Sequence, residues 1–270
     1  MVLESLISPL KAEKKPWKMF FIGVLYSSVA IIVSLILFQQ FASLVMIFFT
    51  VMASIPIIYL TIKMEEAKDL EIRDEKLLIK EHGKALSFLV FLFLGFVISF
   101  SVWYVFLPGA MSEKVFEIQT NTIKQINDPL TGNAINFGGA FLEIFLNNFK
   151  VLLFCLIFAF FYGFGAIFIL TWNASVIGTA IGSIVKTNLG YAAIFPLALL
   201  KYMIHGIPEI LAYFMAGLAG GIISIAVIKH DFNSKNFKHI ILDSADLTIG
   251  AVILLIIAAL LEIFVSPMIL

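Results

Sequence analysis

The sequence predicts an all-α protein, a polytopic integral membrane helical bundle of about seven crossings (five to seven), one of them a short, re-entrant or broken element. The mean hydropathy is +1.05, and 61% of the 270 residues are hydrophobic. Charged residues make up only 13% and lie mainly in a few stretches between long apolar runs. The 18 basic and 18 acidic side chains cancel, so the composition gives no indication of a nucleic-acid partner.

Six apolar runs reach about 20 residues, the length that a helix needs to cross the hydrocarbon core. These runs are residues 17–38, 41–62, 87–107, 150–172, 207–228 and 247–267. The first run is too long for the core of a signal peptide, so we expect it to be retained as a helix. Residues 173–205 contain two shorter apolar stretches and Pro196, which is typical of a broken element packed against protein.

The distribution of basic residues predicts the orientation in the membrane. The three segments that carry most of the basic side chains should be cytoplasmic; they are residues 1–18, 63–84 and 229–246. Residues 108–148 contain only two lysines and should face outside. This assignment requires an additional crossing within residues 173–205. We therefore expect a seven-crossing, multi-pass protein of the cell membrane with a cytoplasmic N-terminus.

We expect three regions along the chain. Residues 1–107 should form a three-span membrane region, residues 108–148 an outer amphipathic connection and residues 149–270 a second membrane region. Within the first region, the cytoplasmic connection 64–86 carries charges of both signs at helical spacing. This pattern is typical of a solvated helix, and a docking surface for a partner is the alternative.

The outer connection should contain two helices, because apolar residues recur in it at helical spacing. The stronger pattern runs directly into the fourth span and consists of Phe141, Ile144, Phe145 and Phe149. The weaker pattern consists of Val115, Ile118, Ile123 and Ile126.

The motif HGIPE places two ionisable groups between apolar runs. Lys201, His205 and Glu209 are four residues apart and would share one face of a continuous helix. Gly206 and Pro208 favour a break instead, with one helix ending near His205 and the next beginning at Pro208. Glu209 would then lie in a first helical turn, where the helix dipole favours a carboxylate. Helix-terminus chemistry is therefore one interpretation of this motif.

A buried polar cluster is the other interpretation. Glu262, late in the last apolar run, should lie at about the depth of Glu209. Lys201–Glu262 and His205–Glu209 pairs would then supply the partners that ionisable groups need in lipid. Such a cluster would either hold the fold together or form a proton or ion site. Asn173 is a further candidate, as a helix cap or as a hydrogen-bond donor between helices.

Five glycines in the second half of the chain should allow helix backbones to approach one another closely. They are Gly178, Gly182, Gly217, Gly220 and Gly221. They predict a compact bundle in this part of the protein.

We expect no catalytic residue, metal site or cofactor. A zinc protease needs two histidines on an unbroken helix, and a serine hydrolase needs a nucleophile beside its histidine; His205 has neither pattern around it. His82 and His239 lie in charged connections and indicate no function. Cys155 lies within an apolar run and should be a small core side chain.

Five short motifs follow one another in a specific order between about residues 140 and 268. They are NN at 147–148, NASVIG at 173–178, HGIPE at 205–209, AGLAG at 216–220 and Glu262. In this order and spacing they resemble the stage II sporulation protein M family, and the N-terminal hairpin resembles its archaeal members. The resemblance implies a membrane fold without enzymatic activity. The family's member in spore formers anchors and recruits peptidoglycan-cleaving enzymes.

These observations favour a non-enzymatic membrane scaffold that recruits a protein partner through residues 108–148 or 64–86. Such a scaffold is compatible with a homo-oligomer in the lipid bilayer. The alternative is a transporter or channel component that uses the polar cluster, because broken helices with ionisable residues form transport sites at membrane depth.

Overall fold

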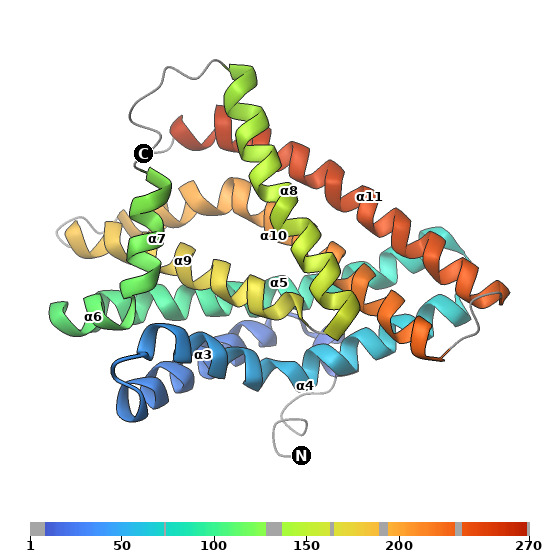
Figure 1. The fold of residues 1–270 in the computed structure, drawn as a ribbon, viewed down its shortest axis with the longest axis horizontal. Helices are drawn as coiled ribbons and strands as arrows, with labels where there is room; N and C mark the ends of the chain where they lie inside the picture. The colour runs from blue at the N-terminus through green and yellow to red at the C-terminus, as the bar shows by residue number, and fades with distance from the viewer. Residues whose placement is uncertain are drawn as a thin grey trace.

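The computed structural model describes residues 9–72, 74–127, 137–162, 165–188, 194–229 and 234–268, and no strand occurs among them. Figure 1 shows the helices arranged as one bundle. They are α2 (Pro9–Lys14), α3 (Lys18–Leu37), α4 (Ala42–Glu71), α5 (Glu75–Phe106), α6 (Gly109–Val115), α7 (Glu117–Asn127), α8 (Phe137–Tyr162), α9 (Ala166–Thr187), α10 (Ile194–Lys229), α11 (Lys235–Phe264) and the short 3-10 helix η2 (Ser266–Met268).

Seven helices in the described part of the chain are long and apolar enough to cross a membrane: α3, α4, α5, α8, α9, α10 and α11. The prediction of an all-α polytopic membrane bundle is therefore confirmed. α4 and α5 are longer than the predicted spans, with 30 and 32 residues. A helix of 30 residues is about 45 Å long, whereas the hydrocarbon core is about 30 Å thick. The charged segments of α4 and α5 therefore project beyond their apolar spans.

The predicted fourth span, residues 150–172, is wrong. α8 ends at Tyr162 and α9 begins at Ala166, so the chain reverses in the middle of the predicted span. At this reversal Gly165 packs so closely on α8 that a Cβ atom would lie only 2.5 Å from the carbonyl oxygen of Phe158. Because the sequence stays apolar through the reversal, hydropathy gave no sign of it.

The predicted broken element in residues 173–205 is also wrong. These residues contain most of α9 and the first third of α10, and both helices are regular, while residues 189–193 lie outside the described residues. α10 continues for 36 residues through Pro208, so no helix ends near His205. The helix packs extensively against α8 and α11, and such packing allows a membrane helix to keep a proline in its interior. The described part of the chain nevertheless contains seven helices that are long and apolar enough to cross a membrane, the number that the distribution of basic residues predicted.

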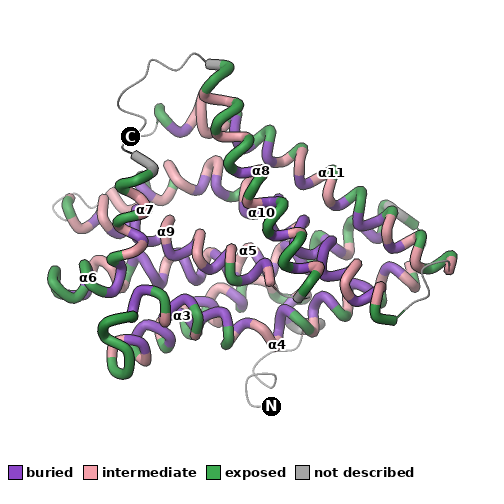
Figure 2. The backbone as a smooth tube through the Cα atoms, in the orientation of Figure 1, coloured by how far each residue is buried: buried purple, intermediate pink, exposed green. Residues whose placement is uncertain are grey.

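Two helices form the centre of the bundle. α5 packs between α3 and α9, while α10 packs against α8, α9 and α11. Figure 2 shows long buried stretches on α5 and α10, whereas α8 and α11 are largely exposed. In the most apolar part of α10, 72% of residues are buried, compared with 22% in both α8 and α11. We infer that α8 and α11 form the wall that faces the lipid.

The contact between α3 and α5 depends on a pair of facing glycines. A Cβ atom on Gly95 would overlap the carbonyl oxygen of Phe20, and one on Gly23 would overlap that of Leu92. The two backbones therefore touch directly, which is how small residues pack membrane helices.

The glycines singled out in the sequence lie at similar contacts. Gly178 and Gly182 of α9 face α5, where a Cβ atom would lie 2.7 Å from the Cβ atom of Phe100 and 2.8 Å from that of Tyr104, respectively. The remaining three lie on α10, where Gly217 faces Ala166, Gly220 faces Leu156 and Gly221 is buried.

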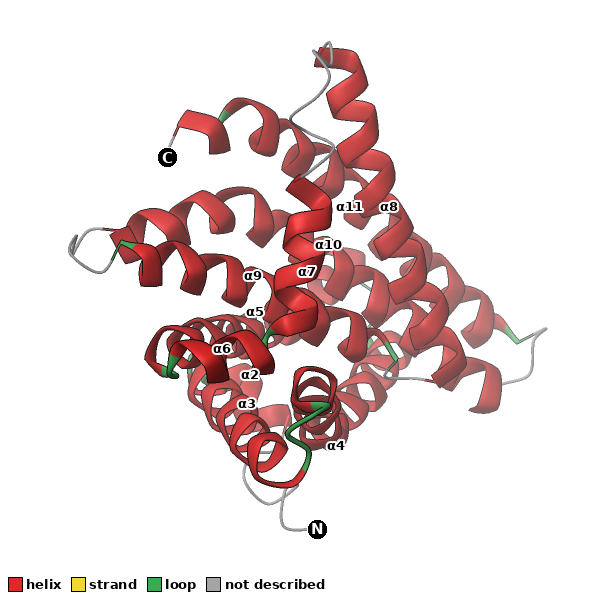
Figure 3. Ribbon diagram, turned by 60° about the vertical axis from the view of Figure 1, so that its left-hand side comes forward, coloured by secondary structure: helices red, strands yellow, loops and turns green. Residues whose placement is uncertain are grey.

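The helix ends gather into two opposite sets. At one end, which we call the α7 end, Gln119 of α7 bonds Ser43 of α4 and Ser175 of α9. At the other, which we call the charged end, Lys68 of α4 bonds Glu13 of α2, and Lys229 of α10 bonds Glu66 of α4. Figure 3 turns the α7 end, with α6 and α7, toward the viewer. That the charged end is cytoplasmic stays a prediction from its basic residues.

We predict that Gly95→Ala destabilises the protein by about 1–3 kcal/mol, because the added methyl group has no space beside the α3 backbone. Thermal unfolding in detergent measures the effect. Gly83→Ala is the matched control on the same helix, since nothing lies within 4 Å of a Cβ atom there. The control should be neutral or stabilising, because alanine favours the helix. Equal unfolding temperatures for the two variants would contradict the close contact.

Candidate functional site

Three of the four residues of the predicted polar cluster lie on one face of α10, and the fourth, Glu262, lies on α11. Because α10 is continuous, Lys201, His205 and Glu209 follow one another at one-turn intervals. His205 Nδ1 lies 2.7 Å from the hydroxyl oxygen of Ser266, which belongs to η2 directly after α11. The HGIPE motif therefore connects α10 with the C-terminal end of the chain.

Glu209 bonds within its own helix. The hydroxyl group of Tyr213, a fully buried side chain, donates a hydrogen bond of 2.8 Å to Glu209 Oε1. Glu262 of α11 lies close enough to Glu209 for their charges to interact. The structure thus brings these two carboxylates near each other, but among the described residues neither the predicted Lys201–Glu262 pair nor the predicted His205–Glu209 pair forms. Ser266 and Tyr213 are the partners instead.

Three further candidate residues, Asn173, Gly206 and Pro208, make contacts within their own helices. Asn173 donates from Nδ2 to the carbonyl oxygen of Ile169 in its own helix, at 2.8 Å, so it bonds neither across helices nor as a cap. Gly206 is buried, with the flexible end of Met203 nearest to it. Pro208 lies in the interior of α10. Among the described residues, no group of three or more His, Cys, Asp or Glu side chains is placed to hold a metal ion.

A second ionisable cluster, which the sequence did not reveal, occupies the charged end. The side chains of Glu65, Asp69 and His82 are almost completely buried there. His82 Nδ1 lies 2.7 Å from Glu65 Oε2. His82 Nε2 lies 3.0 Å from Asp69 Oδ1, an ion-pair contact that lacks hydrogen-bond alignment. Because both ring nitrogens face carboxylates, this arrangement favours the charged imidazolium, which has two donors.

Lys68 extends this cluster to the N-terminal helix. Its ammonium nitrogen lies 2.8 Å from Glu13 of α2 and 2.7 Å from Glu65 of its own helix. A longer contact of 3.8 Å reaches Glu81 of α5. Together with the Glu66–Lys229 pair at 2.7 Å, these contacts connect α2, α4, α5 and α10.

The expectation of a solvated helix in residues 64–86 is therefore wrong for its central charges. The buried face of α4 continues without a change of phase from the apolar span into the charged segment. Its buried positions are Ile57, Ile58, Thr61, Ile62, Glu65, Glu66 and Asp69. If the helical spacing of the buried residues up to Ile62 is continued along α4, Glu65, Glu66 and Asp69 fall on the same inward face. The sequence could therefore have identified these three carboxylates as buried. The position of His82 beside Glu65 and Asp69 depends on the contact between α4 and α5 and had no local signal. The contact of His239 with Asp243, four residues later in α11, could have been predicted from helical spacing.

Comparisons with known proteins identify the family of this chain. The sequence profile described as stage II sporulation protein M matches residues 85–267, more than half of the chain. The chain belongs to the stage II sporulation protein M family. The match begins within α5 and ends in η2, so it also covers α5 to α7, beyond the part in which the sequence motifs were found.

A relative of this chain comes from an archaeon. An uncharacterized protein of Methanocaldococcus jannaschii is 32% identical over 156 residues, which cover 56% of this chain and 84% of the relative. No solved structure matches the chain. The resemblance to the family that the sequence motifs indicated is thus confirmed.

We predict that His82→Ala destabilises the protein by about 3–5 kcal/mol, because it leaves two buried carboxylates without their shared partner. Thermal or denaturant unfolding in detergent measures the change. Lys84→Ala is the control, since Lys84 pairs with Glu81 at the surface, where an ion pair contributes at most about 1 kcal/mol. Similar losses for the two variants would contradict a buried network centred on His82.

Glu13 provides a pH test of how α2 docks, since this helix lies outside the spans. Burial raises the pKa of Glu13 to about 7, against the opposing effect of Lys68 and with a further contribution from Glu65. Docked α2 therefore binds a proton more tightly than released α2, whose Glu13 has its ordinary value of 4.5. Docking should be strongest below that ordinary value and should weaken as the pH rises through about 7.

A spin label on Lys14→Cys, with Cys155→Ser, reports this docking, because Lys14 is exposed and Cys155 is buried. The label should become more mobile as the pH rises. Glu13→Gln should remove this dependence, and a dependence that persists in the variant would show that Glu13 is not its source.

Proposed function

We propose that this protein is a non-enzymatic membrane scaffold that recruits a partner protein through the surface formed by α6, α7 and the beginning of α8. The observation that carries the proposal is the firm attachment of α7 to the bundle. Gln119 is completely buried, accepts a hydrogen bond of 2.7 Å from Ser43 and donates one of 3.2 Å to Ser175. Lys186 adds to this end by donating to the carbonyl oxygens of Tyr104 and Leu107.

The outward face of α7 is polar and exposed. It carries Glu117, Asn121, Lys124 and Gln125. A polar surface that is held rigidly on a helical bundle can bind a partner without a large loss of conformational entropy. These features support recruitment at the α7 end.

The charged segment 64–86 is a weaker candidate for the recruiting surface. Its central groups Glu65, Asp69 and His82 bond one another inside the protein and are not available to a partner. Of the two surfaces that the sequence suggested, the outer connection is therefore the better supported.

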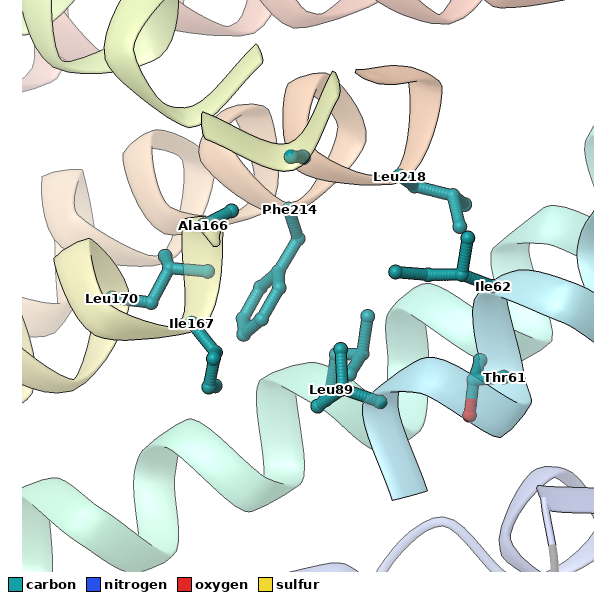
Figure 4. Close-up of a pocket in the computed structure, with 11 residues that line it drawn as sticks. Thr61, Ile62, Leu89, Ala166, Ile167, Leu170, Phe214 and Leu218 are labelled. Carbon is teal, nitrogen blue, oxygen red and sulfur yellow. The ribbon is translucent and has the colours of Figure 1, made fainter. Parts of the chain in front are cut away.

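The small cavity where α4, α5, α8, α9 and α10 meet offers no transport path. The cavity between α4, α5, α8, α9 and α10 has a volume of about 30 Å³, close to the space of one water molecule. Figure 4 shows Phe214, Leu89 and Ile167 at this cavity, where Thr61 is the one side chain with a polar atom. Transport pathways are lined by hydrogen-bonding or charged groups, whereas this space is apolar.

We expect the protein to co-purify from native membranes in mild detergent with a partner that contacts α7. Exchanging the charges of two exposed side chains, Glu117→Lys with Lys124→Glu, should release the partner while Gln119 keeps the fold intact. The control exchanges the charges of two exposed residues at the charged end, Glu71→Lys with Lys76→Glu.

Recovery of the wild type as a lone protein, or equal partner loss in both double variants, would contradict recruitment at α7. A proton- or ion-linked flux in liposomes that disappears in Glu209→Gln would instead establish the transporter alternative.

A further inference from the structure

A polar cavity lies at the α7 end of the bundle, where α7 packs across α9 (Figure 1). It has a volume of about 260 Å³, room for about nine water molecules. Polar side chains from four helices belong to its wall, among them Tyr104 of α5, Lys124 of α7, Ser183 of α9 and Tyr202 of α10. This wall therefore differs from that of the apolar cavity in the middle of the bundle.

The wall offers hydrogen-bond donors that the protein itself does not use. Among the described residues, the ammonium group of Lys124 and the hydroxyl groups of Ser183 and Tyr202 form no hydrogen bond or ion pair. Both hydroxyl groups are accessible, unlike that of Thr120 beside them, whose oxygen atom is buried without a partner. Donors from α7, α9 and α10 are thus open to a ligand.

The charge around the cavity is positive. Besides Lys124, the ammonium nitrogen of Lys186 lies 5.4 Å from the centre of the Tyr104 ring and donates to the carbonyl oxygens of Tyr104 and Leu107. Those carbonyl groups carry no net charge. No carboxylate lines the cavity within the described part of the chain, and Glu117, the nearest acidic residue along α7, is exposed elsewhere on that helix. Ammonium and hydroxyl donors without a carboxylate favour an anionic ligand.

The cavity lies where membrane spans end. Tyr104 is in the last turn of α5, and Lys186 is in the last turn of α9. Tyrosine is enriched at this level of membrane proteins, beside the lipid headgroups. Basic pockets between membrane helices bind the anionic headgroups of lipids.

A phosphate group suits these donors better than a carboxylate does. The donors approach from three helices, so the ligand needs acceptors that point in several directions. A phosphate ester has up to three strong acceptor oxygens, whereas a carboxylate has two in one plane.

We propose that this cavity binds the phosphate group of a phosphate ester. Lys124 neutralises its charge at the rim, Ser183 and Tyr202 donate to its oxygens, and Ile123 and Ile184 contact the carbon atoms of the ester. The phosphate belongs either to a lipid headgroup or to a free phosphate ester. The inference does not depend on the scaffold function, because binding is measured on the chain without a partner protein.

Binding of dioctanoyl phosphatidic acid to the full chain tests the proposal, in a maltoside detergent and a buffer without phosphate. Dioctanoylglycerol is the matched probe, since it has the same acyl chains and no phosphate. The phosphatidic acid should raise the unfolding temperature in a saturable manner, whereas dioctanoylglycerol should not. Equal effects of the two probes would overturn the proposal.

Two variants locate the binding site. Lys124→Gln should weaken binding of the phosphatidic acid about ten-fold, because a hydrogen bond between charged groups is lost. Ser183→Leu keeps both lysines and fills the cavity, so it should abolish binding; Ser183 is only half-buried, so the variant should fold. Lys114→Gln, at an exposed lysine of α6 that does not line the cavity, should leave binding unchanged. Unchanged binding in both Lys124→Gln and Ser183→Leu, or equal weakening by Lys124→Gln and Lys114→Gln, would contradict a site in this cavity.

Glycerol 3-phosphate distinguishes the two sources of the phosphate. If the cavity accepts a free phosphate ester, glycerol 3-phosphate should compete with the phosphatidic acid, and Lys124→Gln should weaken both. If the cavity accepts a lipid headgroup, the phosphatidic acid should bind while glycerol 3-phosphate does not compete.

Discussion

The direct contact of helix backbones around α5 is the constraint on which the rest of the structure depends. In lipid, apolar side chains gain little by leaving their surroundings for one another, so helices associate through close packing and hydrogen bonds. α5 meets α3 at Gly23 and Gly95, and it meets α9 at Gly178 and Gly182. These contacts position α9 beside α10, which carries α8 and α11 on its other side. α8 and α11 pack on α10 with one side and leave their other side exposed, so they can face lipid.

Polar contacts then fix the two ends of this bundle. The α7 end is held by neutral hydrogen bonds among Ser43, Gln119 and Ser175, whereas the charged end is held by buried carboxylates around His82 and Lys68. Buried ionic groups add little net stability when their desolvation is considered, but losing one partner is costly. The charged end therefore acts mainly to specify one arrangement of α2, α4, α5 and α10. The HGIPE motif has a comparable role near the opposite end, where His205 bonds Ser266.

The sequence predicted the parts of the fold that depend on local composition. The first three spans, the number of crossings and the family could all be recognised, because apolar length and motif order are properties of the chain alone. The boundary between α8 and α9 could not, because it depends on how Gly165 packs on Phe158 and not on polarity. Pro208 suggested a break that packing by α8 and α11 prevents. The sequence proposed His205 and Glu209 as a pair, but Glu209 bonds Tyr213 because the helix is continuous, and His205 bonds Ser266 of η2.

The Glu66–Lys229 pair has a consequence for how members of this family diverge. Glu66 precedes the part of the chain that matches the family, and Lys229 lies within it. The same boundary separates Asp69 from His239 and Asp243, whose charges act on one another. A chimera that joins the N-terminal hairpin of one member to the membrane core of another would bring together carboxylates and bases that had not been selected as a set. The hairpin and the core are thus expected to be inherited together, with substitutions at these positions occurring in compensating pairs.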